Sequence, residues 1–404
     1  MRTTTLGQVC AEGGGFVQTG PFGSQLHASD YVSRGVPCVM PQDITDNAVS
    51  TADIARITED DAKRLDRHRL ALGDIVYSRR GDVERRALIR EEQVGWLCGT
   101  GCLRVHFGGE PAADPAYISY YLGLESSRTW IRQHAVGATM PNLNTQILSN
   151  VPLEIHELTE QRAIADVLGA LDDKIAANDR LASLSDDLAA VHFRRALRDT
   201  PMQPMTYADV ADIAGGGTPR TSELSYWDGE VRWATPTDIT ALDAPYLDTT
   251  AKTISEDGLK ACSSVLHPAM SVLMTSRATI GSFAMAMAPT AVNQGFIVAK
   301  AKSDDGTWWL FHEMRSRVTD YISQANGATF LELPRGRFKG LELDWPAETD
   351  LAQFQALVAP LHLRAYAAMV ENRKLVTTRD ALLPELMSGR MRVKDAEATV
   401  EGVL

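Results

Sequence analysis

Several features that would assign a protein to a familiar class are missing from this sequence of 404 residues. No apolar run approaches the roughly 20 residues that a helix needs to span a bilayer, and the N-terminus MRTTTLGQVC lacks the basic-then-apolar pattern of a signal peptide. The five cysteines are an odd number and show no C-x-x-C spacing, so neither a disulfide framework nor a zinc ribbon is predicted. We therefore expect a cytoplasmic protein with reduced thiols and no membrane contact.

Motifs for catalysis are also missing. The chain has no Walker A sequence, no H-E-x-x-H and no Glu-x-Lys triplet of the kind found in nucleases. The segment Asp114 to Tyr117, DPAY, is close to the D-P-P-Y motif of amino-methyltransferases, but no glycine cluster precedes a helix as a methyl-donor site would require. We interpret Asp114 and Pro115 as the start of a helix over about 116–133. The sequence therefore predicts no catalytic residue, no metal site and no cofactor on this chain.

The net charge of −12 argues against a chain that holds nucleic acid by bulk electrostatics alone. Local clusters of basic residues are still compatible with this total. Any affinity for nucleic acid must therefore come from clustered side chains or from partner subunits.

The sequence repeats itself with an offset close to 195 residues. Five short segments recur in the same order: 41–45 at 236–240, 57–61 at 254–258, 74–80 at 271–277, 137–139 at 327–329, and 178–181 at 372–375. One such match could be chance, but five in the same order predict a tandem duplication.

Both copies have the same plan. Short apolar or alternating runs, broken by Gly, Pro and Asp, predict β-strands at 36–40, 74–77, 103–107, 272–274 and 296–299 within mixed α/β domains. A long helix then closes each copy, over about 157–198 and 348–388. The predicted segments are 1–150, 151–204 with the first helix and its linker, 205–345, and 346–404 with the second helix and tail.

The two long helices carry apolar seams at three-four spacing, which is the pattern of a coiled coil. The residues we assign to the helix pair and to the interface with partners are Ile164, Leu168, Leu171, Ile175, Asn178, Leu181, Leu361, Asn372, Leu375 and Leu382. Asn178 and Asn372 interrupt the two seams at matching positions. A buried Asn of this kind typically fixes register or partner.

Because a compact domain separates the two helices, we expect them to pack antiparallel, with the duplicated domains related by a pseudo-two-fold axis. A helix of about 30–35 residues spans about 45–52 Å and would hold the domains apart. Pro360 falls inside the second seam, where it should kink the helix or mark its true start.

Polar and basic loops occur at matching places in the two copies. The segment 79–86, RRGDVERR, has four arginines directly after a strand, where they could reach phosphates or guanine edges. The alternative is a solvated loop with internal ion pairs to Asp82 and Glu84. The residues expected to contact DNA are Gln18, Thr19, Ser24, Arg79, Arg80, Arg85, Arg86, Thr139, Asn142 and Asn144 in the first copy, and Thr218, Arg220, Arg277, Thr279, Thr329, Arg335, Arg337 and Lys339 in the second.

Three segments resemble the specificity subunit of type I restriction-modification systems: GPFGSQLHASDYVSRGVPCVMPQDI at 20–44, GGTPRTSELSYWDGEVRWATPTDI at 216–239, and EQRAIADVLGALDDKIAANDRL at 160–181. The resemblance covers nearly the whole chain. It implies two target-recognition domains, each binding one half of a split DNA sequence, separated by an antiparallel helix pair. The second helix departs from the family pattern at 353–362, where it reads QFQALVAPLH.

The resemblance also implies the partners. We expect double-stranded DNA, two methyltransferase subunits and restriction-translocase subunits, with S-adenosylmethionine, ATP and Mg only on those subunits. This chain would then be a non-catalytic recognition subunit for a bipartite, asymmetric target. The alternatives are the recognition part of a fused restriction-methylation enzyme, or a helical scaffold that binds only protein.

Overall fold

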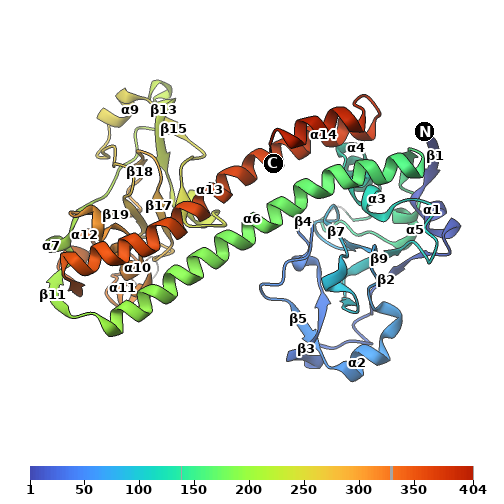
Figure 1. The fold of residues 1–404 in the computed structure, drawn as a ribbon, viewed down its shortest axis with the longest axis horizontal. Helices are drawn as coiled ribbons and strands as arrows, with labels where there is room; N and C mark the ends of the chain where they lie inside the picture. The colour runs from blue at the N-terminus through green and yellow to red at the C-terminus, as the bar shows by residue number, and fades with distance from the viewer. Residues whose placement is uncertain (138, 328–330, 404) are drawn as a thin grey trace. The chain divides into compact units, whose positions relative to one another are not determined.

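The chain forms two compact units in the computed structural model, which describes residues 1–137, 139–327 and 331–403 (Figure 1). Unit 1 comprises Met1–Ile175 and Lys374–Leu404, and unit 2 comprises Ala176–Arg373. Each unit therefore contains one α/β domain and part of each long helix, α6 (Leu158–Asp199) and α13 (Glu348–Met387). Among the described residues, no helix is long and apolar enough to cross a membrane.

Besides its parts of α6 and α13, unit 1 has the following elements. They are β1 Arg2–Thr5, α1 Leu6–Glu12, β2 Phe16–Thr19, β3 Tyr31–Val39, β4 Asp46–Asn47, β5 Ala55–Ile57, α2 Glu59–Arg64, β6 Ile75–Ser78, β7 Arg86–Leu88, β8 Leu97–Cys98, β9 Cys102–His106, α3 Pro115–Tyr121, α4 Glu125–His134, α5 Thr145–Ser149, β10 Pro152–Ile155 and α14 Val393–Glu401.

The domain of unit 2 repeats this series. Its elements are β11 Met202–Thr206, α7 Tyr207–Val210, β12 Ala211–Ala214, β13 Trp227–Ala234, α8 Pro236–Thr240, β14 Tyr246–Leu247, β15 Thr253–Ile254, α9 Glu256–Lys260, β16 Val272–Thr275, β17 Phe283–Ala286, β18 Ala291–Val292, β19 Phe296–Ala301, α10 Thr307–Ser316, α11 Val318–Ser323, α12 Arg335–Lys339 and β20 Glu342–Pro346.

The two domains have the same sheet topology. The five-stranded sheets run β2-β9-β6-β7-β4 and β12-β19-β16-β17-β14, and the three-stranded sheets run β5-β3-β8 and β15-β13-β18. Each domain also has a two-stranded antiparallel sheet, β1-β10 in unit 1 and β11-β20 in unit 2. The mixed α/β fold with an internal repeat, predicted from the sequence, is thus confirmed.

One of the recurring segments, 57–61 and 254–258, contains a helix cap in both copies. Thr58 and Ser255 begin α2 and α9, and their hydroxyl oxygens accept hydrogen bonds from the N–H groups of Asp61 and Gly258, each at 3.1 Å. Such caps satisfy N–H groups that the first turn of a helix leaves without partners. This recurrence in the sequence therefore reflects a helix start that both copies share.

Helix α3 begins as predicted, with Asp114 Oδ1 accepting from the Tyr117 N–H at 2.9 Å and Pro115 in the first turn. The expected single helix over 116–133 is wrong, because α3 ends at Tyr121 and α4 begins at Glu125. Gly123 lies in the break. A Cβ there would come 2.1 Å from Arg86 Nη2, so a larger residue would displace this buried side chain.

The long helices pack antiparallel. Asp172 of α6 forms an ion pair with Arg379 of α13 at 2.9 Å in unit 1, and Asn178 bonds to Asn372 at 2.9 Å in unit 2. Later residues of α6 thus meet earlier residues of α13. Of the predicted seam residues, Ile164, Leu168, Leu171, Leu375 and Leu382 are buried in one cluster of unit 1, with Ile175 partly buried beside them.

Asn178 and Asn372, which interrupt the two seams at matching positions, lie together in unit 2. Asn178 is buried, and its amide also donates to Glu371 Oε2 at 2.8 Å, while the Asn372 amide donates to Asp179 Oδ1 at 2.7 Å. Leu181 and Leu361 are half-buried. A polar layer with these partners favours one register of the two helices.

Pro360 does not mark the start of the second helix. Helix α13 begins at Glu348 and continues through Pro360, which is exposed. Because proline has no N–H, one hydrogen bond is missing at this point of the helix. Burial of Val358 and Leu351 on the opposite face in the core of unit 2 supports the helix around it.

A buried histidine pair joins α10 to α13 in unit 2. His312 Nε2 lies 2.9 Å from His362 Nε2, and the Tyr246 hydroxyl lies 2.8 Å from His362 Nδ1. The indole of Trp308 stacks on the His362 ring at 3.9 Å between centroids. Burial lowers the pKa of His312 to about 3 and that of His362 to about 4.

These pKa values make the stability of unit 2 depend on pH. In the unfolded chain both imidazoles take up protons below about pH 6.5, whereas the folded pair stays neutral until well below pH 5. The contribution of these two histidines to the free energy of unfolding should therefore be fully present above pH 7 and should fall as the pH drops below 6.5. Each histidine should contribute a loss of about 2 kcal/mol between pH 7 and pH 5.

The measurement is chemical unfolding at pH 7 and pH 5 for the wild type and for His362→Gln. Whatever its effect on stability at either pH, the substitution should shrink the difference between the two values by about 2 kcal/mol. An unchanged difference would show that His362 does not stay neutral in the folded unit.

Candidate nucleic-acid interface

Three of the predicted loops of unit 1 converge on one surface. The Leu143 N–H donates to the Arg79 carbonyl at 2.9 Å, and the Gly81 N–H donates to the Pro141 carbonyl at 3.1 Å. The Arg79 guanidinium lies over the ring of Phe22, with its carbon 5.9 Å from the ring centroid. Residues 18–24, 79–81 and 139–144 thus form a surface that we name loop surface 1.

The matching segments converge in unit 2. The Ala278 N–H donates to the Leu331 carbonyl and the Leu333 N–H to the Ser276 carbonyl, each at 3.0 Å. A Cβ at Gly215 would come 2.8 Å from Arg335 Nη1, so this glycine leaves room for that side chain. We name residues 215–220, 276–279 and 331–339 loop surface 2, and the predicted Thr329 lies outside the described residues.

The predicted cations differ in whether an acid neutralises them. Arg85 pairs with Asp82 at 2.9 Å, and Arg277 pairs with Glu332 at 2.8 Å. Within the described part of the chain, no carboxylate lies within 4.0 Å of the charged nitrogens of Arg79, Arg80, Arg220, Arg335, Arg337 or Lys339. An arginine without an acidic partner is available to a phosphate or a base edge at lower cost.

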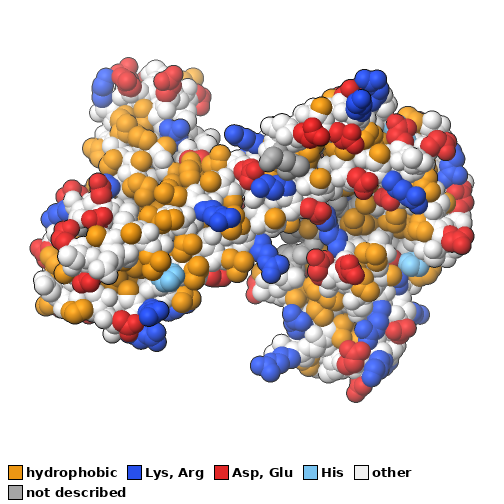
Figure 2. All heavy atoms as spheres, in the orientation of Figure 1, with side chains coloured by type: hydrophobic (Ala, Val, Ile, Leu, Met, Phe, Trp, Pro, Cys, Tyr) orange, Lys and Arg blue, Asp and Glu red, His pale blue; other side chains and the backbone are white. Residues whose placement is uncertain are grey.

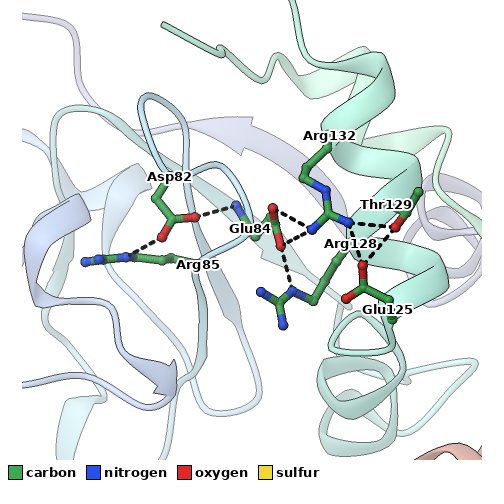
Figure 3. Close-up of polar contacts among 7 residues, drawn as sticks. All are labelled: Asp82, Glu84, Arg85, Glu125, Arg128, Thr129 and Arg132. Carbon is green, nitrogen blue, oxygen red and sulfur yellow. Dashed lines mark hydrogen bonds and ion pairs between the residues drawn. The ribbon is translucent and has the colours of Figure 1, made fainter. Parts of the chain in front are cut away.

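Glu84 does not neutralise the loop arginines as the sequence suggested. It accepts from Arg128 Nε at 2.7 Å and from Arg132 Nη1 at 2.9 Å, both on α4 (Figure 3). Arg132 also pairs with Glu125, whose pKa it lowers. Asp82, Glu84 and Arg85 therefore form ion pairs within unit 1, whereas Arg79 and Arg80 form none with the described residues.

The structure places Arg86 in the interior of unit 1, away from loop surface 1. It lies on β7 and is 7% exposed, and its Nε donates to the Ser119 carbonyl at 2.6 Å. Burial lowers the pKa of this guanidinium. Its position therefore corrects the expectation that all four arginines of segment 79–86 face solvent.

Other predicted residues hold the loops in place. Asn144 caps α5, its Oδ1 accepting from the Ile147 N–H at 2.8 Å, and Gln18 Nε2 donates to the Arg67 carbonyl at 2.7 Å. The Thr218 hydroxyl donates to Gln294 Oε1 at 2.6 Å. Thr19 and Asn142 are half-buried, whereas Ser24, Thr139 and Thr279 are exposed.

Sequence reasoning missed two features of these surfaces. One is Phe22, an aromatic residue exposed within loop surface 1, which could have been noticed inside the polar segment 18–24. The other is a row of exposed apolar residues on α6, Leu184, Leu188 and Val191, at spacings of four and three. Among the described residues, no group of three or more His, Cys, Asp and Glu side chains could hold a metal ion.

Comparison with known proteins gives a consistent result. The family model described as "Type I restriction modification DNA specificity domain" matches residues 28–184 and 200–353. The MjaIX specificity subunit of Methanocaldococcus jannaschii is 31% identical over 168 residues, which is 41% of this chain and 38% of that subunit. The HindI specificity subunit of Haemophilus influenzae is 21% identical over 79% of this chain and 86% of its own length.

A solved structure shares the fold. The crystal structure of the S subunit of a type I restriction-modification system from M. genitalium has a TM-score of 0.63 and 13% sequence identity, and the match covers 95% of each chain.

Proposed function

Because this chain belongs to the family of type I restriction-modification DNA specificity subunits, we propose that it reads an interrupted and asymmetric DNA sequence, one half with each unit. The observation that carries this proposal is the repetition of one loop arrangement on two domains of identical strand order. Each copy presents cations without acidic partners. Two readers in one chain would bind two half-sites.

The two half-sites should differ because the two loop surfaces differ in chemistry. Helix α12 exposes Arg335, Arg337 and Lys339, whereas the matching helix α5 has Thr145, Ile147 and Ser149. Charged and uncharged side chains at equivalent positions contact different base edges. The proposed target is therefore asymmetric.

We propose that methyltransferase subunits dock on the helix pair and that restriction subunits join them. Leu184, Leu188 and Val191 are 57%, 45% and 49% exposed on the part of α6 in unit 2. Figure 2 shows hydrophobic side chains gathered on the visible face of this unit. An apolar stripe at helical spacing suits a helix of a partner. In this proposal the methyl donor, ATP and Mg bind to the partners.

Two experiments separate this proposal from its alternatives. Purified chain with labelled methyl donor and DNA should transfer no methyl group until a methyltransferase subunit is added. Transfer by the chain alone would favour a fused enzyme. A footprint of the assembled complex should protect two separated stretches of DNA, and the lack of any footprint would favour a protein-only scaffold.

A matched pair of substitutions tests loop surface 1. Arg79→Ala removes a cation without an acidic partner and should weaken binding of the complex to its target by about tenfold. The slope of log K against log salt concentration should become shallower by about one. Arg85→Ala removes a cation that Asp82 already neutralises and should change binding by less than about twofold. Titrations at several salt concentrations measure both. Equal losses for the two variants would contradict this assignment.

A further inference from the structure

Phe22 stands out on loop surface 1 because this residue is 51% exposed in a segment of small and polar residues. A single exposed apolar side chain is common on proteins and needs no explanation by itself. Phe22 differs because it lies beside Arg79, whose guanidinium covers one face of the ring. An aromatic ring paired with an arginine is a unit that offers both apolar and hydrogen-bonding contacts.

The backbone around Phe22 is fixed on both sides. The Phe22 N–H donates to Gln25 Oε1 at 3.1 Å, and the Phe22 carbonyl accepts from the N–H groups of Gln25 and Leu26 at 2.8 and 3.2 Å. Leu26 is buried. Gly20 approaches the Gly99 carbonyl so closely that a Cβ would come 2.1 Å from its oxygen. The loop is thus anchored at both ends while the ring points outward.

Arg79 is also held by its backbone. Its N–H donates to the Gly101 carbonyl at 2.8 Å, and its carbonyl accepts from Leu143 at 2.9 Å. Its buried Nε has no hydrogen-bond partner within the described ranges. The side chain that covers the ring therefore starts from a fixed point.

We infer that the Phe22 ring contacts the 5-methyl group of a thymine in the half-site read by unit 1, with Arg79 as the positioning residue. The inference rests on the proposed function. Phenylalanine reads thymine by apolar contact with this methyl group in the major groove. The alternative role of an exposed phenylalanine is to insert between two base pairs, which requires both faces of the ring to be free. The guanidinium of Arg79 over one face of the Phe22 ring opposes such insertion.

In unit 2 the position that matches Phe22 holds a threonine instead of an aromatic residue. Val17 and Ile213 occupy equivalent places in the paired strands of the two units, and they are 196 residues apart. The short helices 28–30 and 224–226 also begin 196 residues apart. Thr218 therefore occupies the position of Phe22. The hydroxyl of Thr218 is bonded to Gln294. At this position the apolar contact should therefore be made by unit 1 alone.

The test uses the complex of the full chain with its methyltransferase subunits and a duplex carrying the mapped target. Each thymine of the unit 1 half-site is replaced in turn by deoxyuridine, which pairs identically but lacks the methyl group. For the wild type, one replacement should lower the methyl-transfer rate at subsaturating DNA by roughly fivefold. Phe22→Ala should lower the rate on the thymine duplex to a similar degree and show no further loss with deoxyuridine.

Two variants keep the test decisive. Phe22→Leu retains an apolar side chain and should keep part of the discrimination, so a folding defect in Phe22→Ala would not hide the effect. Thr218→Val should leave the discrimination at the unit 1 half-site unchanged. A half-site without thymine, a wild-type complex indifferent to every replacement, or full discrimination retained by Phe22→Ala would overturn the inference. A wild-type complex that methylates no defined sequence would instead overturn the proposed function itself.

Discussion

Exchange of residues 205–345 for the corresponding segment of another member of this family should change one half of the DNA target and leave the other half intact. The loops of the exchanged segment contain loop surface 2, and none of loop surface 1 lies within it. A wrong base pair at a directly read position costs about 1–3 kcal/mol, so a new half-site should replace the old one completely at ordinary concentrations.

The structure favours this exchange because the two ends of the segment are neighbours. Strands β11 and β20 pair antiparallel, with Pro204 opposite Asp344 and Met205 opposite Leu343. A segment that enters and leaves through one strand pair can be replaced without rerouting the chain on either side. Its apolar residues pack in clusters within unit 2, one of which also contains Phe193 of α6 and Phe354 of α13, so the replacement must keep the side chains that face these helices.

Mapping of methylated sites in cells that carry the hybrid chain with its methyltransferase measures the result. The reciprocal exchange of residues 1–150 is the matched control and should change the other half only. A change in both halves after either exchange would contradict readout by separate units.

Substitution Asp74→Ala should destabilise unit 1 by about 3–5 kcal/mol, because it leaves a buried cation without its counter-charge. Asp74 is 1% exposed, and its Oδ2 accepts from Arg104 Nε at 2.6 Å. His106 Nδ1 lies 2.7 Å from the other carboxylate oxygen, and the Ala71 N–H donates to Asp74 at 2.7 Å. Denaturant unfolding of wild type and variant measures the change.

Unit 2 shows how the same layer is built without charge. Strand pairing places Val298 where unit 1 has Arg104, and Ser271 stands where unit 1 has Asp74. The double change Asp74→Ser with Arg104→Val should therefore recover most of the stability lost in Asp74→Ala. Ser271→Ala, which removes one hydrogen bond to the Pro268 carbonyl, should cost only about 1 kcal/mol. A loss of less than 1 kcal/mol in Asp74→Ala would show that the ion pair is not needed.

The sequence predicts the architecture because its signals are local and periodic. Three-four spacing identifies both long helices, and five short segments that recur in the same order identify the duplication. The correspondence between Asn178 and Asn372 could be predicted because each interrupts a regular apolar seam, and the two side chains are hydrogen-bonded in the structure. Pro360 does not mark the start of the second helix, since tertiary packing of α13 outweighs one missing hydrogen bond.

The burial and the partners of individual loop side chains could not be predicted, because they depend on neighbours that are distant in sequence. Arg79 and Arg86 lie in one basic segment, yet one reaches the surface beside Phe22 and the other is buried against Ser119. The partners of Glu84 come from α4, more than 40 residues away. Charge spacing alone contains no information on these contacts.

Sequencing of methylated bases in the genome of cells that express this chain with its methyltransferase tests the central claim most directly. The account predicts one interrupted sequence whose two specific halves differ and are separated by unspecified bases. A continuous or palindromic methylated sequence, or methylation unchanged by deletion of this chain, would contradict it.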